Sequence, residues 1–271
     1  MQKIAKLIIF FFAIILTTSC EDVIDLKLDN AAPRLVVDAA IVWTKGTDGA
    51  NQTIRLTTTA PFYNNTVPAA NAAIISVTSN SQVFEFIEDG NTGNYICQNF
   101  VPVLGETYVL NIIYNGVTYI ATEKFIPSPP ILNVVQTEEG GFLGTDKEVR
   151  FLWQDNGAED NYYLSSFNAQ GWLTPDYSPQ SDRFFNGNQM FALYSDEDLA
   201  ANTTLYLRLS GISLQYYNYL VVLFGAASGG NPFQGPPATV RGNVVNPMNT
   251  DDFALGYFSL CESDVQTYIV Q

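Results

Sequence analysis

Residues 107–124 read TYVLNIIYNGVTYIATEK. Asn115 and Gly116 stand between two runs of β-branched and aromatic residues, and Asn-Gly is a preferred pair for a two-residue turn with positive φ angles. The segment predicts an antiparallel hairpin of Thr107–Tyr114 and Val117–Lys124. Successive side chains of a strand point to opposite faces, so one face of the hairpin should enter a core. One face of the first strand carries Tyr108, Leu110 and Ile112, and the other face carries Val109 and Ile113.

The sequence around the hairpin has a similar pattern. Short apolar runs are broken by Gly, Asn and Pro roughly every ten residues. Asp89-Gly90 supplies another turn of the hairpin type. Seven strands within residues 33–126 predict an immunoglobulin-like or transthyretin-like sandwich, in a protein that is mainly β. The strands expected there are Arg34–Trp43, Gln52–Thr59, Ala73–Thr78, Gln82–Glu88, Gly93–Gln98, Thr107–Tyr114 and Thr118–Phe125.

A second β-rich domain is expected at residues 131–271. Pro127-Ser128-Pro129-Pro130 breaks hydrogen-bond ladders, so residues 127–130 are interpreted as a Pro-rich linker between domains. The strands expected beyond it are Ile131–Val135, Glu148–Trp153, Tyr162–Asn168, Gln189–Tyr194, Thr204–Leu209, Ala254–Leu260 and Gln266–Val270.

One helix is expected near residues 213–225, in a stretch without Gly or Pro. Ser213 is placed to cap its N-terminus. Tyr and Val also suit a strand, so a strand remains the alternative. The apolar residues that recur at helical spacing are Leu214, Tyr217, Leu220, Val221 and Phe224.

The chain begins MQKIAKLIIFFFAIILTTSC. Two lysines precede an apolar run at residues 7–16, which is too short to span a bilayer and is typical of a secretory signal peptide at residues 1–19. A small residue then precedes Cys20, the arrangement in which the thiol accepts lipid and the leader is removed. Residues 20–32 would form an acidic tether. An ordinary signal peptide followed by a free cysteine is the alternative.

The chain is strongly acidic, with 27 acidic and 12 basic residues. Removal of the two leader lysines changes the formal net charge from −15 to −17. We therefore expect no nucleic-acid partner, because phosphates need a basic surface. Cys97 and Cys261 could form a disulfide in an oxidising compartment, but because they lie in different predicted domains, two separate buried thiols are preferred.

No histidine is present, which removes Ser-His-Asp and Cys-His pairs, the usual zinc sites and the commonest general base. We therefore expect no catalytic residue, no metal site and no cofactor. Carboxylates in loops leave calcium binding or glycoside hydrolysis as an alternative. In so acidic a chain, however, these loops are expected to be merely solvated. The acids concerned are Asp155, Glu159, Asp160, Asp196, Glu197, Asp198, Asp251 and Asp252.

An exposed aromatic surface can stack on a sugar or contact a partner. Residues 162–185 combine seven aromatic residues with charged ones, and Trp172 and Tyr177 are the candidate ligand face. The alternative is that these rings fill the core, as most aromatic residues of β domains do.

Four segments carry a resemblance to a known family: CEDVIDLKLDNAAPRLVVDAAI at 20–41, IRLTTTAPFYNNTVPAANAAIISVT at 54–78, TYVLNIIYNGVTYIATEKFIPSPPI at 107–131 and GNPFQGPPATVRGNVVNPMNTDDFALGYFSL at 230–260. Together they resemble the outer-membrane lipoproteins of Bacteroidota known as the domain of unknown function 4249. The last segment resembles the NPF-x-x-PP, GN-V and LGYF elements of that family, in which Phe233 is expected to pack into the core. The matching residues are Asn231, Pro232, Phe233, Pro236, Pro237, Gly242, Asn243, Leu255, Gly256, Tyr257 and Phe258.

The resemblance implies an outer-membrane lipoprotein, often encoded beside a TonB-dependent receptor and without an established activity. Glu21, Asp22 and Asp25 resemble the acidic export tag that sends lipoproteins of these bacteria to the cell surface. A periplasmic location, with a merely soluble tether, is the alternative.

The sequence thus leads to three hypotheses. The first is a non-enzymatic accessory lipoprotein that cooperates with a TonB-dependent transporter in nutrient binding or uptake. The second is a carbohydrate-binding or calcium-dependent hydrolytic surface module. The third is an adhesin or a component of envelope assembly.

Overall fold

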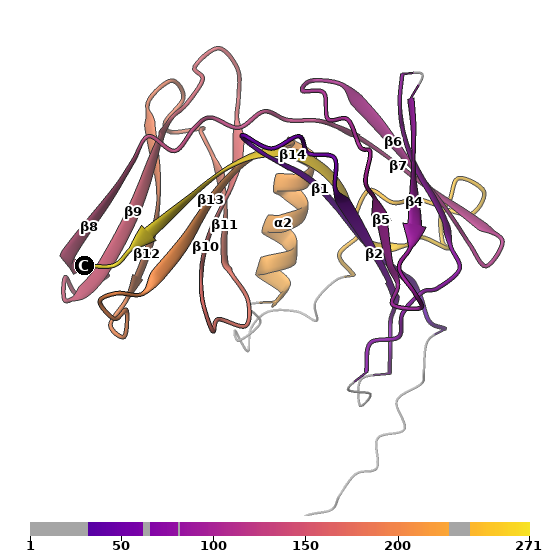
Figure 1. The fold of residues 1–271 in the computed structure, drawn as a ribbon, viewed down its shortest axis with the longest axis horizontal. Coiled ribbons are helices and arrows are strands. Elements are labelled where there is room, and N and C mark those ends of the chain that lie inside the picture. The colour runs from indigo at the N-terminus through magenta and orange to yellow at the C-terminus, as the bar shows by residue number, and fades with distance from the viewer. Residues whose placement is uncertain (1–31, 62–65, 81, 228–238) are drawn as a thin grey trace, which may run out of the picture. The chain divides into compact units, whose positions relative to one another are not determined.

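The computed structural model describes residues 32–61, 66–80, 82–227 and 239–271 (Figure 1). The predicted leader, Cys20, the export tag and Phe233 lie outside the described residues. Residues 33–271 form one compact unit. Its elements are β1 (Leu35–Thr44), β2 (Gln52–Thr58), β3 (Ile74–Ser79), β4 (Gln82–Glu88), β5 (Asn94–Cys97), β6 (Thr107–Tyr114), β7 (Val117–Lys124), β8 (Asn133–Gly140), β9 (Asp146–Gln154), β10 (Tyr162–Ala169), β11 (Asp176–Ser181), β12 (Gln189–Asp196), β13 (Thr204–Ile212), α2 (Leu214–Ala227) and β14 (Leu255–Ile269). The mainly β architecture is confirmed.

The central hairpin is confirmed, because β6 and β7 pair along their whole length. Asn115 and Gly116 have φ angles of 50° and 79°, the left-handed region that the turn requires. Tyr108, Leu110 and Ile112 are each 0% exposed, so this face of the hairpin is the core face.

The first sandwich contains β1 to β7, in the order β1-β2-β5-β4-β3-β6-β7. β4 pairs with both β3 and β5 and forms a corner, and residues from all seven strands meet in one hydrophobic cluster. Aromatic rings fill its centre. The ring of Phe100 lies 4.6 Å from that of Phe84 and 5.4 Å from that of Tyr108.

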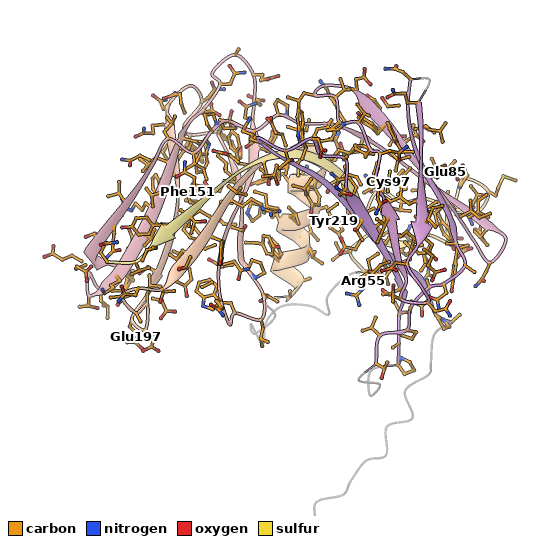
Figure 2. The ribbon with its side chains drawn as sticks, in the orientation of Figure 1. Arg55, Glu85, Cys97, Phe151, Glu197 and Tyr219 are labelled. Atoms are coloured by element: carbon orange, nitrogen blue, oxygen red, sulfur yellow. The ribbon has the colours of Figure 1, made fainter. Side chains whose placement is uncertain are left out.

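The second sandwich packs the sheet β12-β9-β8 against β11-β10-β13-β14. Trp153 of β9 is fully buried between the two sheets, with its ring 5.7 Å from that of Phe151 and 5.4 Å from that of Tyr163. Figure 2 labels Phe151 in this sandwich and Cys97 in the first.

β14 belongs to both sandwiches, which corrects the prediction of two C-terminal strands. It is one strand of 15 residues. Its first part pairs with β1 in parallel and its last part pairs with β13 in antiparallel fashion, as Figure 1 shows for this yellow strand. Ser263 pairs with both Thr44 and Ser210 where the partner changes. Phe258 and Leu260 accordingly belong to the first core, although they come from the end of the chain.

Residues 127–130, the predicted Pro-rich linker, lie between β7 and β8 and are held in place by hydrogen bonds. Ser128 is buried, its N–H donates to Glu262 Oε2 at 2.9 Å, and its hydroxyl donates to the Leu209 carbonyl at 3.0 Å. Glu262 also pairs with Lys45 Nζ at 2.7 Å. The prolines lack N–H groups, but the serine between them keeps its own donors and fixes the segment against β13 and β14.

The predicted helix is confirmed as α2, the one helix of the described residues. Ser213 caps it, because its Oγ accepts from the Tyr216 N–H at 3.1 Å. The helix packs against β10 and β11, with Leu220 as its buried residue. The rings of Tyr216 and Tyr219 lie 4.7 and 4.8 Å from that of Tyr257 (Figure 2 labels Tyr219). α2 therefore covers part of the sheet face that neither core uses.

β11 is a strand that the sequence pattern missed. Its sequence DYSPQS is polar and contains Pro179. β11 lies at the end of the strand order and pairs with β10 alone. An edge strand needs only one set of ladder hydrogen bonds, so it tolerates a proline.

The C-terminal motif residues pack on one another. Asn243 Nδ2 donates to the Phe258 carbonyl at 2.8 Å, and the Phe258 N–H donates to Asn243 Oδ1 at 2.9 Å. A Cβ on Gly242 would lie 1.6 Å from the Gly256 carbonyl oxygen, and one on Gly256 would lie 1.9 Å from that of Val37. Gly256 also has a φ of +90°. Glycine at 256 therefore lets β14 approach β1, and glycine at 242 lets the segment before β14 approach β14.

We expect Gly256→Ala to lower the free energy of unfolding by about 3 kcal/mol or more, because left-handed strain and overpacking each cost roughly 1–3 kcal/mol. Urea denaturation of the purified variant measures this loss. Gly46→Ala is the matched control, since Gly46 has a φ of +82° and no atom within 4 Å of a Cβ. Equal losses in the two variants would contradict the steric explanation.

Candidate functional site

The structure separates the two residues of the predicted ligand face. Trp172 is half-buried against the second core, with its ring 4.8 Å from that of Tyr194. Tyr177 lies on β11 opposite Ser166 and is 46% exposed. Phe167 enters the second core, so the adjacent Ser166 and its partner Tyr177 face the other side of the sheet, where α2 lies. Of the two, Tyr177 alone stays a candidate for surface binding.

A groove of about 430 Å³ opens beside Tyr177 on this side of the sheet. Two rows of side chains cross the strands there. The first row is Tyr177 on β11, Ser166 on β10, Arg208 on β13 and Val265 on β14, and the second is Asn168 on β10, Tyr206 on β13 and Thr267 on β14. Neighbouring strands lie about 4.8 Å apart, so Tyr177 and Arg208 are separated by roughly 10 Å across the sheet. We call this site the Tyr177–Tyr206 groove.

Strand β13 shows how the sequence builds the groove. Its leucines at 205, 207 and 209 enter the second core, while Tyr206, which is 51% exposed, and Arg208 alternate to the other face. That alternation is a signal in the sequence that could have identified both residues as outward-facing. Their neighbours on β10, β11 and β14 come from distant segments, which local patterns do not align.

The groove keeps polar groups free for a ligand. Asn168 Oδ1 accepts from the Ala169 N–H at 2.9 Å, which leaves the amide nitrogen of Asn168 unengaged within the described residues. The other polar side chains of the two rows make no hydrogen bond or ion pair with any described residue: Ser166, Tyr177, Tyr206, Arg208 and Thr267.

Arg208 is the only charged side chain among the residues that line the groove. The acids nearest to groove residues along their strands point to the opposite face. Asp176 pairs with Phe167, and the Asp264 carboxylate accepts from the Ile131 N–H at 2.6 Å. In a chain with 27 acidic residues, the groove is therefore a locally positive site.

Asp155 and Asp182 are among the buried acids in this half of the chain, and both serve the structure. Asp155 accepts from the Tyr163 hydroxyl at 2.6 Å and from the Gly187 N–H at 2.8 Å. Burial, with help from this carboxylate, raises the pKa of Tyr163, so the phenol stays protonated. Burial also raises the pKa of Asp182, which accepts from the Asn161 N–H at 2.7 Å. These carboxylates are occupied as hydrogen-bond acceptors and are not aimed at a ligand.

The remaining acids do not converge either. Glu159 and Asp160 are exposed beside a second hollow of about 590 Å³ near the start of α2. Within the described ranges, no group of three or more His, Cys, Asp or Glu side chains is arranged to hold a metal ion. The others are exposed or half-buried in or beside turns: Asp196, Glu197, Asp198, Asp251 and Asp252.

Cys97 and Cys261 are free thiols in different hydrophobic clusters. Burial raises the pKa of both, that of Cys261 to about 11. The thiolate is the nucleophilic form of cysteine, so neither side chain is poised for catalysis at neutral pH.

Glu123 is a buried carboxylate that the sequence pattern did not single out. Its oxygens accept from the Tyr257 hydroxyl at 3.0 Å and from the Lys124 N–H at 3.1 Å. Burial raises the pKa of Glu123, and hydrogen bonds from Lys124, Tyr257 and Ser213 offset part of that rise. The carboxyl therefore joins β7, β14 and the start of α2.

A family described as "Domain of unknown function (DUF4249)" matches this chain over residues 21–267. No curated protein matches it. Among solved structures, a two-domain fibronectin type-III segment of chicken tenascin is 10% identical, with 66% of this chain and 90% of that chain covered and a TM-score of 0.22. A cytokine receptor complex is 11% identical, with 65% and 82% covered and a TM-score of 0.26. Within the described residues, no helix has the length and hydropathy needed to cross a bilayer.

Trp172→Ala should lower the free energy of unfolding by about 2 kcal/mol, part of the roughly 3–5 kcal/mol lost when a fully buried tryptophan is truncated. Tyr177→Ala should cost less than about 1 kcal/mol, because its ring is largely at the surface. Denaturant titration of both variants checks the difference. Equal costs would mean that Tyr177 is a packing residue.

Stability should fall as pH rises through the titration of Glu123. Folding raises the pKa of Glu123 above its ordinary 4.5. At pH values between the ordinary pKa and the raised pKa, the folded protein therefore binds more protons than the unfolded chain. Glu123→Gln should therefore be more stable than wild type at pH 7, with the difference shrinking toward pH 4 in thermal denaturation. Glu85→Gln, at an exposed position of β4, is the control (Figure 2). A pH-independent loss of stability in Glu123→Gln would contradict this expectation.

Proposed function

Because this chain belongs to the family described as "Domain of unknown function (DUF4249)", we propose that it is a lipid-anchored accessory protein of the outer membrane that binds a ligand without transforming it. In this role it cooperates with a TonB-dependent β-barrel transporter in nutrient binding or uptake. The partner and the membrane come from the family resemblance and the leader, while the binding role comes from the site.

The Tyr177–Tyr206 groove is the observation that carries the proposal. It offers unengaged hydroxyl, amide and guanidinium groups on a rigid sheet, which is what a binding site requires. No carboxylate is among its lining residues, and the whole chain lacks histidine, so the groove offers neither of the two commonest kinds of general base. Recognition without chemistry fits this set of side chains best.

The anchor is supported by the position of the family match, which starts at Glu21, directly after Cys20. A leader that is removed during export would lie outside the shared region in this way. Lipid on Cys20 would hold the protein durably, since each buried CH₂ contributes about 0.8 kcal/mol. We assign Glu21, Asp22 and Asp25 to export to the cell surface, with the periplasmic face as the alternative.

Palmitate labelling and co-purification from mild detergent test the proposal on tagged full-length protein. We expect labelled wild-type protein in the membrane fraction together with a β-barrel receptor. Cys20→Ala should lose the label and leave the membrane fraction. An unlabelled wild-type protein would contradict the anchor, and recovery without any β-barrel partner would contradict the accessory role.

A further inference from the structure

We propose that the Tyr177–Tyr206 groove binds an acidic oligosaccharide, whose carboxylate pairs with Arg208 and whose ring stacks on the tyrosines. The inference rests on the proposed binding function and names the class of ligand.

The charge selects an anion. Arg208 is exposed, makes no ion pair with any described residue and has no acid beside it in the lining. A guanidinium presents parallel N–H donors that match the two oxygens of a carboxylate. The rest of the chain repels anions, with a formal net charge of −15. An anionic ligand is therefore attracted by this site in particular, and a large polyanion is disfavoured.

The lining selects a sugar among anions. A sugar ring presents C–H groups on its face and hydroxyls at its rim, so it needs an apolar platform surrounded by groups that both donate and accept. Tyr177 and Tyr206 supply rings with polar ends. Small hydroxyl side chains at Ser166 and Thr267 and the free amide nitrogen of Asn168 supply the rim contacts.

The platform is held in place before a ligand arrives. The Tyr177 ring lies parallel to that of Phe224 on α2, with an angle of 16° and a centroid distance of 6.4 Å. Tyr206 and Arg208 stand on β13, which is hydrogen-bonded to strands on both sides. Little side-chain freedom remains to be lost on binding at Tyr177, which favours affinity. The volume of about 430 Å³ falls within the roughly 300–1,000 Å³ range of small-ligand sites.

The position of the groove argues against a peptide that binds as an added strand. The row formed by Tyr177, Ser166 and Arg208 crosses β11, β10 and β13, whose backbone groups pair with one another. A peptide that binds as an added strand needs an open sheet edge and would leave this row unused. A ligand that uses Tyr177, Ser166 and Arg208 is therefore held by side chains and not by backbone hydrogen bonds.

Calorimetric titration of the detergent-solubilised full-length lipoprotein tests the assignment. The probes are trimers of galacturonate, mannuronate and glucuronate, and the neutral trimers of galactose, mannose and glucose, with tetraglutamate as an acidic peptide. We expect at least one uronate trimer to bind ten-fold or more tighter than its neutral partner. Its affinity should fall as salt is added, because exposed charges are screened.

Arg208→Gln should weaken that trimer at least ten-fold, and Tyr206→Ala should weaken it as well. Arg55→Gln is the matched control, since Arg55 is exposed on β2 of the other sandwich (Figure 2) and should leave affinity unchanged. Thermal denaturation verifies that each variant is folded.

Three results would overturn the assignment: binding of none of the uronate trimers, equal binding of neutral trimers or tetraglutamate, or an unchanged affinity in Arg208→Gln. Palmitate labelling and receptor co-purification on the same preparations separate the two proposals. If they succeed while every sugar fails, the ligand class is wrong and the accessory role stands. If sugar binds while they fail, the site is real and the transporter partnership is wrong.

Discussion

The parallel pairing of β1 with β14 is the constraint on which the rest of the structure depends. These strands come from opposite ends of the described chain, so the first core is incomplete without the C-terminal strand. Phe258 and Leu260 are almost fully buried there, and side chains of this kind each contribute about 1.5–3 kcal/mol. That sum of about 3–6 kcal/mol reaches the lower end of the roughly 5–15 kcal/mol of net stability of a typical domain. Glycine at 256 permits the close approach, and Glu262 of β14 forms an ion pair with Lys45, which directly follows β1.

Sharing one strand between two sandwiches has a consequence for function. Both cores use one side of the sheet that runs from β11 to β1, which leaves the other side to α2 and to solvent. Side chains that alternate away from the second core are therefore gathered on a broad rigid surface. The Tyr177–Tyr206 groove lies on that surface, where the strands hold aromatic, amide and guanidinium groups in fixed rows. A binding role follows more readily from such a surface than a catalytic one.

Local chemistry explains which features could be predicted. The Asn115-Gly116 turn, the alternation of Tyr108, Leu110 and Ile112, and the capped helix after Ser213 depend on neighbours within a few residues, and each is confirmed. The polar edge strand β11 carries no such pattern, because ladder bonds to β10 alone hold it. Nothing in the proline segment at 127–130 indicates that it is held in place, because its buried hydrogen bond is made with Glu262, which lies far along the chain. Trp172 and Tyr177 are close in sequence but fall on different sides of the sheet, since a turn separates them.

The sequence by itself determined the mainly β class, the central hairpin, the helix, the acidic charge and the absence of histidine chemistry, because these follow from composition and short-range periodicity. Tertiary structure alone decided that β14 completes both sandwiches and that Tyr177, Arg208 and Tyr206 share one groove. Strand partners and their register are fixed by hydrogen bonds and burial between distant segments. Alternation along a single strand tells which residues share a face, and only pairing with other strands tells which residues from elsewhere will join them.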